Sequence, residues 1–378
     1  MAGPLHGLMI TELAGLGPAP FCGMVLADLG ATVIRLARAG GSGLFGEEHH
    51  DVLDRGKQSV IVDLKQSDGR DIVLRAAARS AALIEGFRPG VTERLGVGPA
   101  ECLARNPSLV YGRMTGWGQE GPLAGRAGHD IDYIALSGAL HAIGPSERPV
   151  PPLNLVADFG GGGMLLAVGV LAAIIHARAT GEGQVVDAAM VDGSALLTAS
   201  HHGLLADGWW VPERETNLLD GAAPFYTTYR TSDGGHVAVG ALEPQFFAAL
   251  LEGLGLEVDQ VGAQGDREAW PEMRRLFAER FGSRTRDAWA EHFAGTDACV
   301  APVLSLVEAP ADPHNRHRGT FVEIEGVVQP GPAPRFQRTR TDIPSPPEPA
   351  GASTDSVLAT LGFSPDEIGK LRAAGAVA

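Results

Sequence analysis

Two side chains that can exchange protons stand in front of apolar, glycine-rich stretches. His129 precedes the stretch 131–143, and Asp158 precedes the four glycines 160–163 and the stretch 164–177. Both stretches have apolar residues at helical spacing, so we expect each side chain at the N-terminal end of a helix. Free N–H groups at such ends stabilise negative charge. An imidazole and a carboxylate placed there suit proton transfer at a carbon next to a carbonyl, with N–H groups near Asp158 holding the enolate oxygen.

Simpler interpretations of the same residues stay open at this point. Asp158 is also a typical helix N-cap, and His129 is also typical of a hydrogen-bonded loop histidine. The four glycines 160–163 cost backbone entropy, so they are most useful where another group approaches the chain closely. The glycine run therefore favours a functional interpretation of this region.

Length and charge limit the classes of protein that this chain can be. A chain of 378 residues has room for two domains, and 44% apolar residues can build a sizeable core. The net charge of −15 argues against nucleic acid as a partner, because binding phosphate backbones needs a basic surface. A small anionic ligand is compatible with this charge if a few arginines gather locally.

Cysteine usage and hydropathy indicate the compartment. The three cysteines are scattered, so we expect neither a disulfide framework nor a metal cluster. We expect no signal peptide, because Met1 leads directly into a strand-like run. The longest apolar stretch, 160–175, is too short and too rich in glycine to span a bilayer, so no membrane partner is predicted. A cytoplasmic protein is the expectation.

An alternation of strands and helices predicts the first domain. Strands are expected at 8–13, 32–36, 59–64, 83–87, 109–114 and 184–190, with helices at 21–29 and 68–82 among the connections. This pattern predicts an α/β fold with a doubly wound sheet. Ligands of such sheets bind outside the carboxyl ends of the strands. Four cations, Arg38, Lys65, Arg88 and Arg94, each follow a predicted strand, which favours an anion pocket over solvated strand ends.

The rest of the chain predicts a smaller α+β domain and a returning arm. We expect a large domain at 1–190, connecting helices at 191–221, a small domain at 222–310, and a proline-rich arm with C-terminal helices at 311–378 that returns to the large domain. The small domain should hold a hairpin with strands at 224–231 and 236–240, followed by helices at 246–253, 270–281 and 285–293. Within it, Glu243 stands before a proline, as solvated turn residues often do. Helices are also expected at 354–361 and 364–374, the last with a capping box.

A nicotinamide-dependent oxidoreductase is one alternative. Gly15 and Gly17 match part of the dinucleotide fingerprint, but Pro20 occupies the place of the third glycine. Arg35 and Arg38 suit the phosphate-bearing ribose of NADP better than the ribose of NAD. The broken fingerprint argues against this class.

Several stretches together carry a resemblance to a known family. The most specific is the pairing of Gly128-His129-Asp130 with Asp158-Phe159-Gly160-Gly161-Gly162. Others are 26–31, 55–57, 62–65, 85–91, 115–122 and 361–375. With these stretches the chain resembles the type III CoA-transferase superfamily, and within it the α-methylacyl-CoA racemase branch, which His129 marks.

The resemblance implies a fold, an assembly and an activity. It implies a Rossmann-like large domain, a smaller domain, and two identical subunits interlocked like chain links, with active sites between the large domain of one subunit and the small domain of the other. The implied reaction inverts C2 of a 2-methylacyl-CoA thioester by proton transfer through an enolate, with His129 and Asp158 on opposite faces of that carbon. Glu243 should orient His129 of the partner subunit, and Asp130 should share charge with Asp158. No cofactor is implied, because CoA is part of the substrate.

The resemblance also carries over a set of CoA contacts. These are Arg38, Val62, Asp63, Leu64, Lys65, Gly86, Phe87, Arg88, Arg94, Gly128, His129, Asp130, Ile131, Asp132 and Tyr133. Two features depart from the family: Asp132 stands where close relatives often have Asn, and the segment 39–50 is slightly longer than usual.

Two further classes share these residues. A CoA-transferase would use Asp158 as a nucleophile that forms an acyl anhydride and does not need His129. A non-catalytic acyl-CoA-binding protein would use the CoA contacts alone, and the joint presence of His129, Asp158 and Glu243 argues against it.

Overall fold

The structure is a computed structural model that describes residues 3–40 and 51–378. The part of the 39–50 segment that departs from the family, 41–50, therefore lies outside the described residues. The chain forms two compact units. The first comprises Met1–Ser137, Leu153–Leu197 and His314–Ala378, and the second comprises Gly138–Pro152 and Thr198–Pro313.

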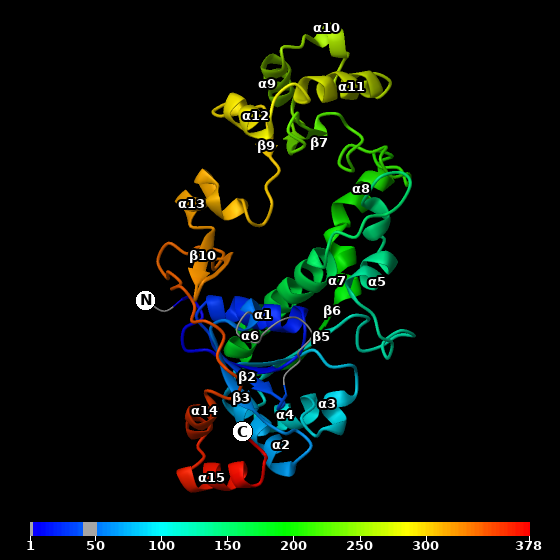
Figure 1. Cartoon of the computed structure of the whole chain (residues 1–378). Helices are drawn as coiled ribbons and strands as arrows, with labels where there is room; N and C mark the ends of the chain where they lie inside the picture. Colours follow the sequence, from blue (N-terminus) through cyan, green and yellow to red (C-terminus); the bar gives the residue numbers. More distant parts are fainter. Residues whose placement is uncertain (1–2, 41–50) are drawn as a thin grey trace. The chain divides into compact units, whose positions relative to one another are not determined.

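The first unit is built on a six-stranded parallel sheet with the strand order β3-β2-β1-β4-β5-β6 (Figure 1). Its strands are β1 (Met9–Leu13), β2 (Thr32–Ala37), β3 (Lys57–Ile61), β4 (Ala82–Glu85), β5 (Val110–Thr115) and β6 (Gln184–Ala189). This is the strand order of doubly wound dinucleotide-binding folds, in which ligands lie outside the carboxyl ends of the strands. The predicted α/β, Rossmann-like class is confirmed.

Helices connect these strands and complete the unit. They are α1 (Pro18–Asp28), α2 (Ser67–Arg79), α3 (Val91–Arg94), α4 (Pro99–Arg105), α5 (Asp130–Leu136), the wide π-helix η4 (Leu155–Met164), α6 (Leu165–Thr180), α7 (Met190–Leu197), α13 (Pro313–Arg318), α14 (Thr354–Thr360) and α15 (Pro365–Ala373), with a short 3₁₀ turn η2 (Val52–Asp54) and a hairpin of β10 (Phe321–Ile324) and β11 (Val327–Pro330). The predicted capping box of the last helix is confirmed, because Ser364 and Glu367 each accept the backbone N–H of the other.

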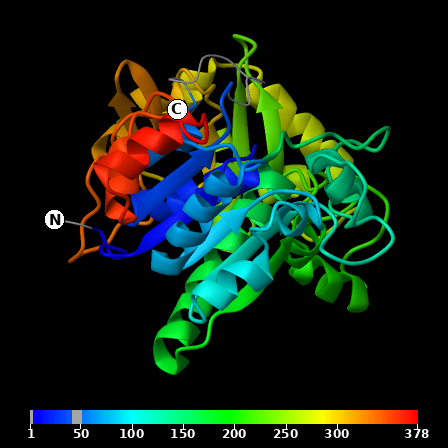
Figure 2. The same cartoon turned by 90° about the horizontal axis from the view of Figure 1, so that it is seen from below.

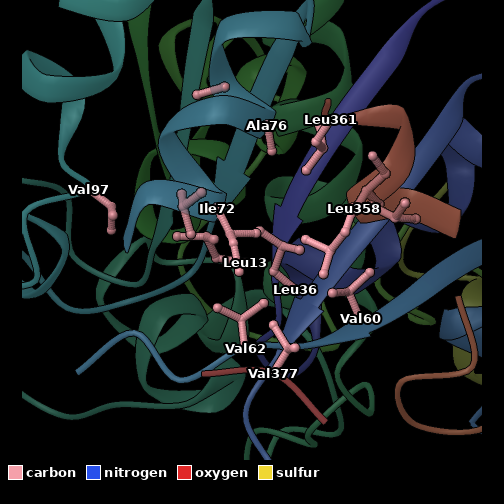
Figure 3. Close-up of a cluster of buried hydrophobic side chains, with 14 of the residues drawn as sticks. Leu13, Leu36, Val60, Val62, Ile72, Ala76, Val97, Leu358, Leu361 and Val377 are labelled. Carbon is pink, nitrogen blue, oxygen red and sulfur yellow. The ribbon is translucent and has the colours of Figure 1, made fainter. Parts of the chain in front are cut away.

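The C-terminal helices close the core of the first unit. Leu358 of α14 and Leu361, the C-cap of that helix, are buried with Leu36 and Val60 from the sheet (Figure 3). Val377, four residues from the last helix, bridges to the backbone of residue 62 beyond β3. Figure 2 shows these last helices in red beside the blue strands. Burial of large aliphatic side chains from both ends of the chain stabilises this edge of the sheet.

The proline-rich segment before α14 lies along the first unit. The N–H of Gly56 donates to the carbonyl of Ser345, and the N–H of Ser59 donates to the Glu348 carboxylate. Both bonds are made by the edge strand β3 or by the residue before it.

Two predictions about the helices next to the candidate site are wrong. The helix expected at 131–143 ends at Leu136, because Gly138 takes a left-handed conformation with φ of 87°, and a 3₁₀ turn η3 (Leu140–Ala142) follows. The helix expected to begin at 164 begins nine residues earlier, at Leu155, as η4 and continues without a break through α6.

The length of the continuous helix contradicts the expectation that the apolar stretch 160–175 is too short to span a bilayer. Leu155–Thr180 spans 26 residues and is long and apolar enough to cross a bilayer by length and composition, although 44% of its most apolar window is buried. The expectation that this stretch is too short to span a bilayer is therefore wrong. A core helix of a globular protein passes the same test, and α6 packs on β5 and β6, where Val170 and Val186 would touch any side chain added at Gly112 and Gly169.

The second unit is an α+β structure around a three-stranded antiparallel sheet, β7-β8-β9. Its elements are α8 (Ala199–Ala206), β7 (Tyr226–Arg230), β8 (His236–Gly240), α9 (Pro244–Leu254), α10 (Val258–Val261), α11 (Trp270–Phe281), α12 (Arg286–Phe293), β9 (Val300–Pro302) and the turn η5 (Ala309–Ala311). The predicted hairpin and the three predicted helices are confirmed. The predicted helical character of 207–219 is wrong, because the side chain of Asn217 bonds both the N–H and the carbonyl of Val211 and organises this stretch as turns.

Candidate active site

His129 stands at the N-cap position of α5. Its backbone N–H donates to Oδ2 of Asp132 at 2.9 Å, which closes the first turn of the helix. The imidazole is exposed. Asp132 therefore serves the helix end, a role that the amide oxygen of an Asn could also fill, so its departure from the family pattern has a local structural explanation.

Gly128 is required by the aromatic side chains behind it. The hydroxyl of Tyr133 donates to the carbonyl of Gly128, and Trp117 meets the Tyr133 ring edge-on with centroids 4.7 Å apart. A Cβ at Gly128 would lie 2.7 Å from the Tyr133 ring and 3.0 Å from the Trp117 ring. Burial, followed by the charges of Asp158 and Asp132, raises the pKa of Tyr133 to about 12, so its hydroxyl stays protonated as a donor.

Asp130 joins α5, whose N-cap is His129, to η4, which carries Asp158. Its carboxylate is 5% exposed, and Oδ2 accepts the backbone N–H groups of Ala157 at 2.7 Å and Asp158 at 2.8 Å. Within the described part of the chain, Oδ1 has no hydrogen-bond partner. The expectation that N–H groups at Asp158 hold an enolate oxygen is therefore wrong for these two groups, because Asp130 already occupies them.

Asp158 lies one turn inside the wide helix rather than at its N-cap, which is Asn154. The Asn154 amide donates to Oδ2 of Asp158 at 3.1 Å. Burial is the main cause of a raised pKa at Asp158, and the charge of Asp130 adds to it, while the Asn154 hydrogen bond and the charge of His129 oppose it. The plain N-cap interpretation is excluded, and the carboxyl group is tuned toward its protonated form.

The glycine run serves packing of the chain against itself. A Cβ at Gly161 would lie 2.6 Å from the N atom of Ser194 in α7, and one at Gly163 would lie 2.7 Å from the carbonyl of Pro18 in α1. A Cβ at Gly193 would lie 1.8 Å from the carbonyl oxygen of Gly161. The close approach that the glycines permit is thus made by α1 and α7, which fix the wide helix from two sides.

The N-terminal end of α1 faces Asp158. Gly17, the N-cap of α1, has a φ of 69°, and a Cβ there would lie 3.5 Å from Oδ2 of Asp158. Residues 18 and 20 are prolines without an N–H, and the N–H of Phe21 bonds the carbonyl of Gly17. Ala19, which is 1% exposed, is consequently the residue among 18–20 that carries a backbone N–H.

The four cations predicted at the sheet edge are exposed there. Arg38 follows β2, Lys65 follows β3, and Arg88 and Arg94 follow β4. Because these neighbouring strands are parallel, their carboxyl ends meet at one edge. None of the four takes part in an ion pair between described residues, and the charge of Arg88 lowers the pKa of Tyr133, which places Arg88 within electrostatic reach of α5.

The other predicted contacts at β3 are made by groups with structural roles. Val62 is buried in the core and Leu64 packs against it. The Asp63 carboxylate accepts the N–H of Lys65 and the amide of Gln66, and these bonds lower the pKa of Asp63. This stretch can therefore meet a ligand mainly through its backbone and through Lys65. Past β4, Gly86 is exposed and Phe87 is half-buried, and Ile131 is exposed on α5.

Glu243 belongs to the second unit, where it is the N-cap of α9 and is exposed. Its charge adds to partial burial in raising the pKa of the Cys299 thiol. Leu242, directly before it, lines an apolar pocket of about 270 Å³ with Trp209, Trp210 and Trp270.

The described residues contain no group of three histidine, cysteine or acidic side chains arranged to hold a metal ion. Arg35, which suggested a phosphate-bearing ribose, is paired with Asp54 at 2.9 Å. That pairing weakens the argument for a nicotinamide site.

The first unit thus combines a parallel sheet of the doubly wound strand order, exposed cations after the carboxyl ends of its strands, and a junction of α5 and η4 that carries His129, Asp130 and Asp158. The chain belongs to CoA-transferase family III, whose family model matches residues 5–354.

Individual relatives narrow this class. The chain is 47% identical to the mouse protein named alpha-methylacyl-CoA racemase, over 96% of this chain and 95% of that protein, and 46% identical to the human protein of the same name, over 97% and 96%. Human succinyl-CoA:glutarate CoA-transferase is 29% identical over 99% of this chain and 90% of that protein. The crystal structure of a CAIB/BAIF family protein from Brucella suis matches with a TM-score of 0.81 at 26% identity, covering 96% of this chain and 100% of that one.

The contacts of three residues beside Asp158 or Tyr133 were not predicted from the sequence. Gly17 faces Asp158, Asn154 donates to it, and Trp117 backs Tyr133 with a buried indole N–H that has no partner among the described residues. Only Asn154 had a local signal, since a residue four positions before Asp158 lies on the same helix face.

Proposed function

We propose that this chain is a racemase that inverts C2 of 2-methylacyl-CoA thioesters. The observation that carries the proposal is the junction of α5 and η4. There Asp130, the residue directly after His129, accepts the backbone N–H of Asp158. Two groups that can each hold a proton are thereby fixed to one another. Identity of 47% and 46% to the mouse and human racemases over nearly the whole chain supports the same reaction.

The reaction needs one base and one acid on opposite faces of C2. One of His129 and Asp158 removes the C2 proton, and the electron pair of that bond moves into the C1–C2 bond while the thioester oxygen becomes an enolate oxygen. The other group then returns a proton to the opposite face of C2, and the enolate electrons re-form the thioester carbonyl. The raised pKa of Asp158 suits this exchange, because it brings the acid closer to the weakly acidic carbon it serves.

The enolate oxygen needs a positive partner, and the N-terminal end of α1 can supply one. Gly17 faces Asp158, and the backbone N–H of Ala19 lies in the same first turn. An N–H donor aimed at developing negative charge contributes about 3 kcal/mol to a transition state. This helix end replaces the N–H groups that Asp130 occupies.

The substrate's handle and the assembly complete the proposal. Arg38, Lys65, Arg88 and Arg94 hold the phosphates of CoA, which needs no separate cofactor because CoA is part of the substrate. In an interlocked homodimer, Glu243 orients His129 of the partner subunit, and the apolar pocket beside Leu242 receives part of the acyl chain. A reducing cytoplasmic setting fits three free thiols.

Deuterium exchange tests the reaction directly. In D2O, the wild-type protein should place deuterium at C2 starting from either epimer of a 2-methylacyl-CoA, as measured by NMR. Asp158→Asn should abolish inversion in both directions, since one face loses its acid and base. Absence of exchange with a panel of branched acyl-CoA esters would refute the proposal.

A CoA-transferase is the second candidate, favoured by full-length similarity to human succinyl-CoA:glutarate CoA-transferase. In that reaction the Asp158 carboxylate attacks the thioester carbonyl and CoA leaves as a thiolate. A His129→Ala variant that still moves CoA between acids, with an anhydride at Asp158 that hydroxylamine traps, would favour the transferase over the racemase.

A further inference from the structure

The loop 86–94 carries two of the four cations at the sheet edge, and it is fastened from beneath. Glu85, the last residue of β4, is fully buried, and its Oε2 accepts the N–H of Phe87 at 2.6 Å. The loop therefore begins with a buried carboxylate that fixes its first turn, one residue before Arg88.

Arg113 of β5 ties both ends of this loop together. It is the register neighbour of Glu85, and its Nε donates to Oε1 of Glu85 at 3.0 Å. Its Nη1 donates to Oε1 of Glu93 in α3 at 2.8 Å, and Nη2 lies 3.4 Å from Oε2 of the same carboxylate. Arg113 is 7% exposed, so a single buried guanidinium spans the residue before the loop and the residue before Arg94.

The Arg113 guanidinium opposes the negative charge of the Glu85 and Glu93 carboxylates. Burial raises the pKa of Glu85 to about 7, against the opposing effects of the Phe87 N–H and Arg113. Partial burial also acts on Glu93, but its hydrogen bonds with Arg113 prevail and lower its pKa. Two carboxylates beside an anion site, in a protein of net charge −15, would repel phosphate unless a cation neutralises them.

We propose that Arg113 is a positioning residue for the CoA handle. By bonding Glu85 and Glu93 it offsets part of their negative charge and fixes the loop so that Arg88 and Arg94 face the phosphate groups of the substrate. Arg113 itself is buried and does not touch the substrate. This inference rests on the proposed acyl-CoA substrate.

The role of Arg113 can be tested by comparing a CoA thioester with a thioester that lacks the phosphates. Arg113→Met should raise KM for a 2-methylacyl-CoA about tenfold or more, because two charge-assisted hydrogen-bond ties are lost, while kcat changes by less than about twofold. The same variant should leave KM unchanged for the matching acyl-pantetheine thioester, which has the same reacting carbon and no phosphates. Arg113→Lys keeps a buried positive charge but not the two-sided fork, so it should raise KM for the CoA ester by a smaller factor. Arg372→Met, which removes an arginine from an exposed ion pair with Asp355 in the same unit, is the matched control and should change neither KM.

Each outcome decides. Equal increases in KM for the CoA and pantetheine esters would mean a merely structural role and would overturn the inference, as would an unchanged KM for the CoA ester in Arg113→Lys. If Arg113→Met does not fold, Arg113→Lys alone decides. Calorimetric titration with free CoA separates the two proposals. If the wild type does not racemise the substrate but Arg113→Lys weakens CoA binding, only the racemase proposal is refuted. If the wild type is an active racemase and Arg113→Lys binds CoA as tightly, only the role of Arg113 is refuted.

Discussion

Substituting Gly193 by alanine tests how the helix that carries Asp158 is held. The added Cβ would lie 1.8 Å from the carbonyl oxygen of Gly161 and 2.7 Å from its Cα. A carbon–oxygen contact needs about 3.3 Å, so α7 and η4 must separate by about 1.5 Å at this crossing. Both sides of the contact are backbone, so no rotamer change relieves it. We expect a loss of about 1–3 kcal/mol in the free energy of unfolding.

The same displacement of η4 should also lower the rate of C2 proton exchange. Asp158 lies three residues before Gly161 on the same wide helix, and a misplacement of about 1 Å in an active site costs about 10²-fold in rate. We therefore expect Gly193→Ala to melt at a lower temperature and to exchange C2 deuterium about a hundredfold more slowly. Thermal unfolding by circular dichroism and NMR of the exchange in D2O measure the two effects.

A control within the same unit separates this contact from the general effect of glycine replacement. A Cβ at Gly369, inside α15, meets no heavy atom within 4 Å. Gly369→Ala should stabilise the protein by about 0.5–1 kcal/mol and leave exchange unchanged, because a helix interior favours alanine over glycine. If Gly193→Ala kept the wild-type melting temperature and exchange rate, the explanation of the glycines as packing contacts would be refuted.

Three further predictions concern the first unit. Asp130→Asn should move the limb of the pH profile of kcat/KM that belongs to Asp158 to lower pH, because removing the neighbouring negative charge lowers the pKa of Asp158; a shift to higher pH would contradict this. Lys57→Met should cost about 3–5 kcal/mol in urea unfolding, since it leaves the fully buried Glu12 without its cation, and an unchanged midpoint would argue against a paired charge there. Ser364→Ala should cost about 1 kcal/mol through the lost cap of α15, checked by the same titration with the wild type as reference.

The fold of the first unit was predictable because each strand and helix carries its own signal. Apolar runs of strand length alternate with helical patterns from residue 8 to residue 190, and a parallel sheet follows from that alternation. The gathering of Arg38, Lys65, Arg88 and Arg94 at one edge follows in turn, because the carboxyl ends of neighbouring parallel strands coincide. These inferences need only the local sequence and the rule for parallel sheets.

The junction at Asp158 was not predictable in the same way. The bond from Asp130 to the backbone of Asp158 spans 28 residues, and no local pattern reports a contact of that separation. The start of the wide helix is not predictable, because the glycines at 160–163 supply no apolar periodicity and the apolar pattern begins only after them. Gly138 is a stop signal for the preceding helix, but the apolar spacing that continues to residue 143 favours a longer helix.

The four cations at the carboxyl edge of the sheet have a consequence for the direction of the reaction. In the proposed racemase they would bind the CoA portion of the thioester, which is the same in both epimers, so their attraction would be equal for reactant and product. Such binding concentrates the ligand on the protein but lowers no barrier and favours neither stereoisomer. In the proposed reaction, acceleration has to arise where the transition state differs from both epimers, at C2 and the enolate oxygen beside α1, α5 and η4, and a mixture left with such a racemase should drift toward equal amounts of each epimer.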